Sequence, residues 1–243
     1  MKKIIAMLLA LTMVLALAAC GGEPKETNGN DPVQQTTPVE NQGNDPVETE
    51  PQAQNPSKVE LTVEYLKSLP ETPAEEFEYG MNWDDDGIII RAYNGNSDIV
   101  VIPAEINGLP VKEIAGYVFA NECPIRGILI PESVKVIDEV FGNNSGTELV
   151  VAEGVEVIAY NSFNNCAVLK QVKLGENIQT IEEIAFFNCR ALEKLNISSS
   201  LTEMSDDAKG SAFLGCSNLT IYGEAGSFIE GVANELGIPF VAE

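Results

Sequence analysis

Five cysteines and an excess of carboxylates are the residues of this 243-residue chain that could do chemistry. Cys20 closes an apolar N-terminal segment, and four further cysteines follow in the second half of the chain: Cys123, Cys166, Cys189 and Cys216. The chain has no histidine, which removes the usual general base, the Ser-His and Cys-His nucleophile systems and most zinc sites. It also lacks a glycine-rich phosphate-binding loop. We therefore expect no enzymatic activity and no cofactor.

Acidic residues outnumber basic ones by 37 to 14, so a glycosidase-type carboxylate pair is the one catalytic arrangement that the composition allows. Glu75-Glu76 and Glu182-Glu183 are adjacent pairs, but both occur where a turn or a repeat faces solvent. The run Asp84–Asp86 could suggest calcium, yet it lacks the spaced ligands of an EF-hand loop, which favours a solvated turn. The net charge of −23 makes nucleic acid and anionic membrane surfaces poor partners.

The elements that would position these residues are copies of one repeat. Val-Lys-Val-Ile at 134–137 recurs as Val-Glu-Val-Ile at 155–158 and as Ile-Gln-Thr-Ile at 178–181. With two outer copies, the closing apolar residue falls at 114, 137, 158, 181 and 204, in steps of 23, 21, 23 and 23. Self-similarity at about 20 to 29 residues is the signature of a leucine-rich or related solenoid repeat. Stacked coils would place the closing residues in one buried column, with these at its centre: Ile137, Ile158 and Ile181.

A phenylalanine follows each central copy, and in three copies a cysteine stands three residues after the ring: Cys166, Cys189 and Cys216. Because of the recurring short strand, this Phe-x-x-Cys core and the Ile-Pro pairs at 102–103 and 130–131, the chain resembles the BspA-like leucine-rich repeat family of bacterial surface proteins. The resemblance covers roughly residue 87 to the C-terminus. It implies a β-rich α/β solenoid, a right-handed leucine-rich repeat superhelix of about five repeats.

Two copies depart from the family pattern. One has Asn144-Ser145-Gly146 where the cysteine belongs, and the last carries an insert at 205–210 before Phe213. Both departures lie in connecting turns, where extra length costs little.

The position of the cysteines in the repeat bears on their chemical state. A shared repeat position predicts small buried residues in successive coils, about 4.8 Å apart. Disulfides persist outside the cytoplasm, but parallel Cβ vectors give them poor geometry. The pattern favours free thiols and leaves a disulfide open. No metal site is expected, because cysteines in a row do not provide the tetrahedral ligand geometry of a structural zinc site.

The first 58 residues predict export. Lys2 and Lys3 precede a 16-residue uncharged run, which is too short to span a bilayer and suits a signal peptide at 1–19. Leu-Ala-Ala-Cys-Gly at 17–21 resembles a bacterial lipobox, which implies a diacylglyceryl-modified Cys20 on the membrane. An ordinary signal peptide or an uncleaved anchor is the alternative. Residues 20–58, rich in Pro, Gln and Asn, predict a disordered tether.

Both ends of the repeat array, assigned to 101–219, are expected to be capped. In the N-terminal cap, 59–100, we expect a short helix over 59–69 and a hairpin of 77–83 with 88–93 around an Asp-Gly turn. In the C-terminal cap, 220–243, Ser227 and Glu230 predict a capping box that opens a helix to about Leu236. Gly237 would end it, and Phe240 and Val241 would return as a strand.

Alternation along the strand before each short motif predicts which side chains face outward. The inner residues are expected to be Ile128, Ile130, Leu149, Val151, Val172, Leu174, Leu195 and Ile197. The outward row, the candidate binding face, is then Gly127, Leu129, Glu148, Val150, Gln171, Lys173, Lys194 and Asn196.

A lipid-anchored, rigid solenoid without histidine offers a surface rather than a reaction centre. We therefore expect an extracytoplasmic, surface-exposed protein that binds or adheres to a host or cell-surface protein or glycan. A passive envelope lipoprotein without a dedicated ligand is the first alternative, and a carboxylate-based hydrolase is the second. The sequence leaves the partner, the envelope type and the oligomeric state undefined.

Overall fold

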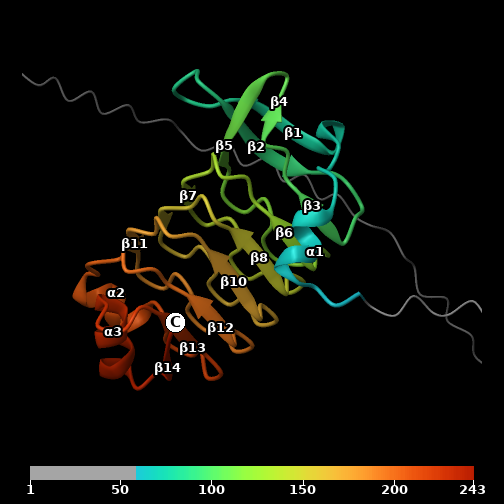
Figure 1. Ribbon diagram of the computed structural model, residues 1–243. Helices are drawn as coiled ribbons and strands as arrows, with labels where there is room; N and C mark the ends of the chain where they lie inside the picture. The colour runs from blue at the N-terminus through green and yellow to red at the C-terminus, as the bar shows by residue number, and fades with distance from the viewer. Residues whose placement is uncertain (1–58) are drawn as a thin grey trace, which may run out of the picture. The chain divides into compact units, whose positions relative to one another are not determined.

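The repeats form a stack of coils in the computed structural model, which describes residues 59–243 (Figure 1). The signal peptide at 1–19, Cys20 and the tether at 20–58 lie outside the described residues. No helix within 59–243 is long and apolar enough to cross a membrane. The two ends of each coil are short strands, and these stack into two parallel sheets.

The larger sheet has seven parallel strands in the order β14-β13-β12-β10-β8-β6-β3. Their bounds are β3 (Ile99–Val101), β6 (Gly127–Leu129), β8 (Leu149–Ala152), β10 (Gln171–Leu174), β12 (Lys194–Asn196), β13 (Thr220–Gly223) and β14 (Phe240–Ala242). One apolar residue of each central strand points into the core and is fully buried: Val100, Ile128, Val150, Val172, Leu195 and Ile221. The sheet therefore has more strands than the five expected repeats, because flanking segments extend it at both ends.

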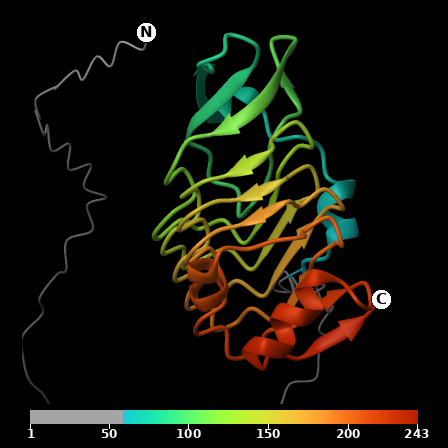
Figure 2. The same cartoon turned by 90° about the vertical axis from the view of Figure 1, so that its left-hand side faces the viewer.

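The smaller sheet is formed by the short motifs themselves. Its strands are β7 (Val136–Ile137), β9 (Val157–Ile158) and β11 (Thr180–Ile181), in the order β11-β9-β7. Ile137 pairs with Ile158, which pairs with Ile181, and all three side chains are buried. The predicted column of closing isoleucines is confirmed. Figure 2 shows the two sheets on opposite sides of the coils.

An antiparallel hairpin covers the first coil, as the sequence predicts. Its strands are β1 (Phe77–Met81) and β2 (Ile88–Tyr93), and a 3-10 turn, η1 (Ala74–Glu76), precedes β1. β2 also pairs in parallel with β5 (Leu109–Ile114), and β5 pairs in turn with β4 (Glu105–Ile106). In the turn, the Asn82 side chain accepts from the N–H groups of Asp86 and Gly87. Lys112 donates a hydrogen bond to the Asp86 carboxylate, and this bond lowers the pKa of Asp86. Asp86 therefore stabilises the turn of the hairpin.

Three helices complete the described chain: α1 (Val63–Ser68), α2 (Asp206–Ser211) and α3 (Phe228–Leu236). The expected C-terminal helix is present, and Gly237 ends it at a φ of 68°. The predicted capping box is wrong, because the buried Ser227 hydroxyl makes no hydrogen bond. Glu230 reaches one residue further back and accepts from the N–H of Gly226 instead.

Five phenylalanine rings form a stack through the core. Neighbouring centroids lie 4.9 to 5.9 Å apart, and their planes differ by 3° to 21°. The rings are those of Phe119, Phe141, Phe163, Phe186 and Phe213, and all are buried. Parallel stacking follows from the repeat, since equivalent residues of successive coils are related by one translation.

A column of left-handed turns accompanies the rings. The residue two positions after each phenylalanine has a positive φ, which favours asparagine or glycine: Asn121, Asn143, Asn165, Asn188 and Gly215. The Asn188 amide donates to Asn165, and Asn165 donates to Asn143, at 2.7 and 3.1 Å. The asparagines therefore shape the turn and also bond one coil to the next.

The cysteines cap backbone carbonyl groups inside the stack. The thiols of Cys166, Cys189 and Cys216 donate to the carbonyls of the phenylalanines one coil earlier: Phe141, Phe163 and Phe186. Asn144, which replaces cysteine in the departing repeat, is fully buried and donates in the same way to the carbonyl of Phe119. All four cysteines of the described chain are free thiols.

Replacing Phe163 by alanine should destabilise the fold strongly, because it removes the ring that stacks between two others. We expect a loss of about 3 to 5 kcal/mol of unfolding free energy, measured by denaturant titration of residues 59–243. The exposed Leu214→Ala variant is the control and should change stability by less than about 0.5 kcal/mol. Equal effects of the two substitutions would contradict the stacked core.

The buried thiols should resist modification in the native protein. Donation toward the neighbouring Cys166 sulfur raises the pKa of Cys189, donation toward the Cys189 sulfur raises the pKa of Cys216, and burial raises the pKa of Cys123. Since the thiolate is the reactive form, a thiol reagent at pH 8 should label Cys166, Cys189 and Cys216 only after denaturation. The half-buried Cys123 should react first, and rapid native labelling of Cys189 would contradict the ladder.

Candidate binding surfaces

The outward row of the seven-stranded sheet follows the sequence prediction in every strand but β8. Leu149 pairs with Gly127 on one side and Gln171 on the other, so Leu149 and Val151 occupy the outward positions of β8. Val150 stands in the inner column and is fully buried. The prediction that Val150 faces outward, with Leu149 and Val151 inside, is therefore wrong by one residue.

The error has a clear physical cause. β8 reads Leu-Val-Val-Ala, and all four residues are buried, so alternation of polarity gives no signal within it. The spacing did contain the answer, because the inner residues Ile128, Val150 and Val172 are each 22 positions apart. Outward residues can be apolar in β8 because another element covers them.

That element is α1, which lies across the outer face of β6 and β8 (Figures 1 and 2). Leu66 is fully buried against Leu149 and Val151, with Leu61 and Leu129 at the rim of the same cluster. The helix begins where the Thr62 hydroxyl accepts from the N–H of Tyr65. The sequence predicted this helix but assigned it to the end cap, whereas it occupies half of the predicted binding face.

Gly127 shows how closely the helical segment approaches the sheet. A Cβ atom at this position would lie 3.4 Å from a Leu66 methyl and 3.5 Å from those of Leu61. An ion pair between Lys67 and Glu153 holds the other end of α1. The helical segment therefore covers Gly127 and Leu129, so these two residues of the predicted binding face are not available for contact with a partner.

Glu148 also has an internal role. Its carboxylate pairs with Arg126 at 3.0 Å and with Lys170 at 2.9 Å, and its side chain is only 16% exposed. The hydrogen bond from Lys170 raises the pKa of that amine. This network links three successive coils beside the sheet.

The outer face stays open over β10, β12 and β13. Its outward residues are the predicted Gln171, Lys173, Lys194 and Asn196, together with Thr220 and Tyr222, which the sequence analysis did not include. The Lys194 amine lies 4.5 Å from the centre of the Tyr222 ring, and the Asn196 amide donates to Glu243. A hollow of about 660 Å³ adjoins Lys173 and Tyr222. We call these six residues the open strand face.

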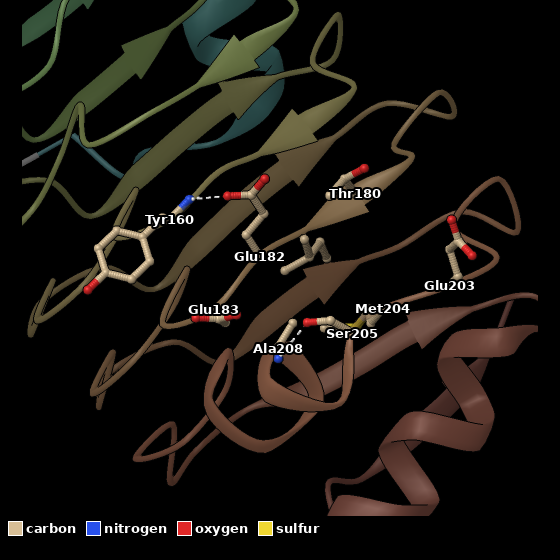
Figure 3. Close-up of a pocket in the computed structure, with 9 residues that line it drawn as sticks. Tyr160, Thr180, Glu182, Glu183, Glu203, Met204, Ser205 and Ala208 are labelled. Carbon is tan, nitrogen blue, oxygen red and sulfur yellow. Dashed lines mark hydrogen bonds between the residues drawn. The ribbon is translucent and has the colours of Figure 1, made fainter. Parts of the chain in front are cut away.

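A second hollow, which the sequence analysis did not predict, adjoins the smaller sheet (Figure 3). Its volume is about 630 Å³, and its lining includes Tyr160, Thr180, Glu182, Glu183 and Glu203. Tyr160 is half exposed at one side of this Tyr160 groove, and Glu203 projects from the next coil at the other side. The signal in the sequence was the insert at 205–210, which interrupts the repeat beside the groove.

The Tyr160 groove is acidic. Glu182, Glu183 and Glu203 line it, and no basic residue does. Glu182 also accepts from the N–H of Tyr160 at 2.9 Å. Nearby, burial and, to a smaller extent, the charges of Glu139 and Glu182 raise the pKa of the Asp138 carboxyl.

The comparisons with known proteins agree with this architecture. Residues 138–223 match the model of the BspA type leucine-rich repeat region in six copies. The crystal structure of the T. pallidum leucine-rich repeat protein TpLRR is 30% identical, with a TM-score of 0.52, over 63% of this chain and 71% of that one. The chain belongs to the BspA-type leucine-rich repeat family.

Further leucine-rich repeat neighbours are more distant. A leucine-rich repeat protein from Bacteroides capillosus is 25% identical over 63% of this chain and 98% of its own, with a TM-score of 0.39. A leucine-rich repeat protein from Bacteroides ovatus is 20% identical over 63% of this chain and 47% of its own, with a TM-score of 0.46. No curated protein matches the chain.

Removing the Leu66 side chain should uncover the apolar half of the outer face of this BspA-type sheet. We expect Leu66→Ala to lower the free energy of unfolding by about 2 kcal/mol or more. It should also raise the fluorescence of a hydrophobic dye, since Leu149 and Val151 become exposed to solvent. Glu64→Ala, an exposed change in the same helix, is the control. Unchanged dye binding in the Leu66 variant would mean that α1 does not cover the sheet.

Proposed function

We propose that this BspA-type protein is exported, lipidated at Cys20 and displayed at the cell surface, where the open strand face binds a protein or glycan partner. The export signal and lipobox at 1–21 support the location. A tether such as 20–58 would hold the repeats away from the membrane. The repeats supply a rigid surface for contact.

One observation carries the binding proposal, namely that the open strand face differs from the rest of the sheet. α1 covers the apolar outer residues of β6 and β8, whereas β10, β12 and β13 present amines, amides and a tyrosine ring. Such side chains donate and accept hydrogen bonds, and tyrosine is enriched at binding interfaces. Lys173 makes no ion pair within 59–243, so its charge is free to meet a ligand.

The location is tested in cells. Wild-type protein should fractionate with the membrane, carry a diacylglyceryl group on Cys20 by mass spectrometry and be cleaved by protease added to intact cells. Cys20→Ala should abolish the lipid. The variant should then either be released from the cell or accumulate as an unprocessed precursor. Membrane association without lipid on Cys20 would contradict the anchor.

Binding is tested with residues 59–243 on arrays of glycans and matrix proteins. For any hit, Lys173→Glu combined with Tyr222→Ala should weaken binding at least tenfold, because both residues border the hollow on the open strand face. Lys135→Glu repeats the charge change on the opposite side of the coil and should leave the affinity unchanged. Hits that ignore the Lys173 and Tyr222 changes would place binding elsewhere, and a complete lack of hits would favour a passive envelope lipoprotein.

A further inference from the structure

The backbone hydrogen bonds of the smaller sheet stop at β11. In the earlier coils, Glu156 and Val157 donate to the carbonyl of Lys135, and Ala159 donates to that of Ile137. The next coil repeats this pattern: Gln179 and Thr180 donate to the carbonyl of Glu156, and Glu182 donates to that of Ile158. By the same rule, the segment 202–205 should donate to the carbonyls of Gln179 and Ile181. Among the described residues no such bond exists, and β11 pairs only with β9.

The interruption is local and has a structural cause. Just before it, the hydroxyl groups of Ser198 and Ser200 donate to the carbonyls of Glu176 and Ile178. Just after it, the N–H groups of Phe186 and Asn188 again donate to the next coil. Between these points Ser205 caps α2, and the six-residue helix draws the chain out of the repeat path.

The Tyr160 groove occupies this interruption. Thr180 and Ile181 line one side and Glu203, Met204 and Ser205 line the other, so the hollow lies between a strand edge and the segment that would have paired with it. Figure 3 shows Thr180 and Glu203 on neighbouring coils, with Glu182 and Tyr160 further along the same hollow. The groove is therefore flanked by backbone groups that a further strand could use.

An unpaired strand edge pairs readily with an extended chain, and peptide recognition by strand addition uses this property. Such backbone pairing gives affinity, and the side chains around the edge select the sequence. Here those side chains are three glutamates and the half-exposed ring of Tyr160, without a cation in the lining. Carboxylates and an aromatic face together favour lysine or arginine.

We propose that the free edge of β11 binds an extended, lysine- or arginine-rich segment of a partner protein, which adds a fourth strand to the smaller sheet. The backbone of the segment pairs with Gln179 and Ile181, while its basic side chains meet Glu183 and Glu203 and cover the ring of Tyr160. This site is separate from the open strand face, on the other sheet.

The probe is a synthetic eight-residue peptide of alternating lysine and valine, titrated into the full-length protein in detergent. Two further peptides separate backbone from charge: one carries N-methyl groups on alternate residues of the edge that would pair, and the other replaces every lysine by glutamate. We expect the lysine peptide to bind, and each altered peptide to bind at least tenfold more weakly. Raising the salt concentration should also weaken the lysine peptide.

Variants of the protein locate the site. Glu183→Lys combined with Glu203→Lys should reduce binding at least tenfold, since both exposed carboxylates line the groove. Glu64→Lys combined with Glu235→Lys, exposed positions on α1 and α3, makes the same net charge change away from the groove and should leave binding within about twofold. Lys173→Glu should not weaken it, which keeps this test independent of the open strand face.

Three outcomes would overturn the proposal. Equal binding of the N-methylated peptide would show attraction to charge without strand addition. Equal loss in the two double variants would show a response to net charge alone. Absence of measurable binding at low salt, with circular dichroism showing a folded protein, would show that the edge is not a peptide site.

Discussion

The register between successive coils is the constraint on which the rest of this structure depends. Except at the edge of β11, each coil completes backbone hydrogen bonds of the one before it, so equivalent residues must coincide in height and orientation. A longer coil has to place its extra residues in a turn, which explains why the steps between closing isoleucines can be 21 or 23 residues. The core columns of isoleucine, phenylalanine and cysteine follow from that register.

The same constraint explains which substitutions a column accepts. At the cysteine position the requirement is a small donor that reaches the phenylalanine carbonyl of the previous coil. Asn144 meets this requirement with an amide, and its own oxygen accepts from the N–H groups of Gly146 and Thr147. The departing repeat therefore keeps the hydrogen bond of the pattern while changing the residue type.

Sequence alone predicted what the period determines. Ile137, Ile158 and Ile181 fell in one column, and the hairpin, the C-terminal helix and most of the outward row were found from spacing and turn residues. The register of β8 was missed because Val150 and its neighbours are all apolar. The covering by α1 and the groove beside β11 depend on long-range packing and on an insert outside the period, so local patterns could not reveal them.

The position of α1 has a mechanical consequence. Any tension that reaches the repeats through residue 59 acts first on this short helix, which is held by the Leu66 cluster and the ion pair of Lys67 with Glu153. Detachment of the helix would expose Leu149 and Val151 without breaking the strand pairing between coils, because α1 lies outside both sheets.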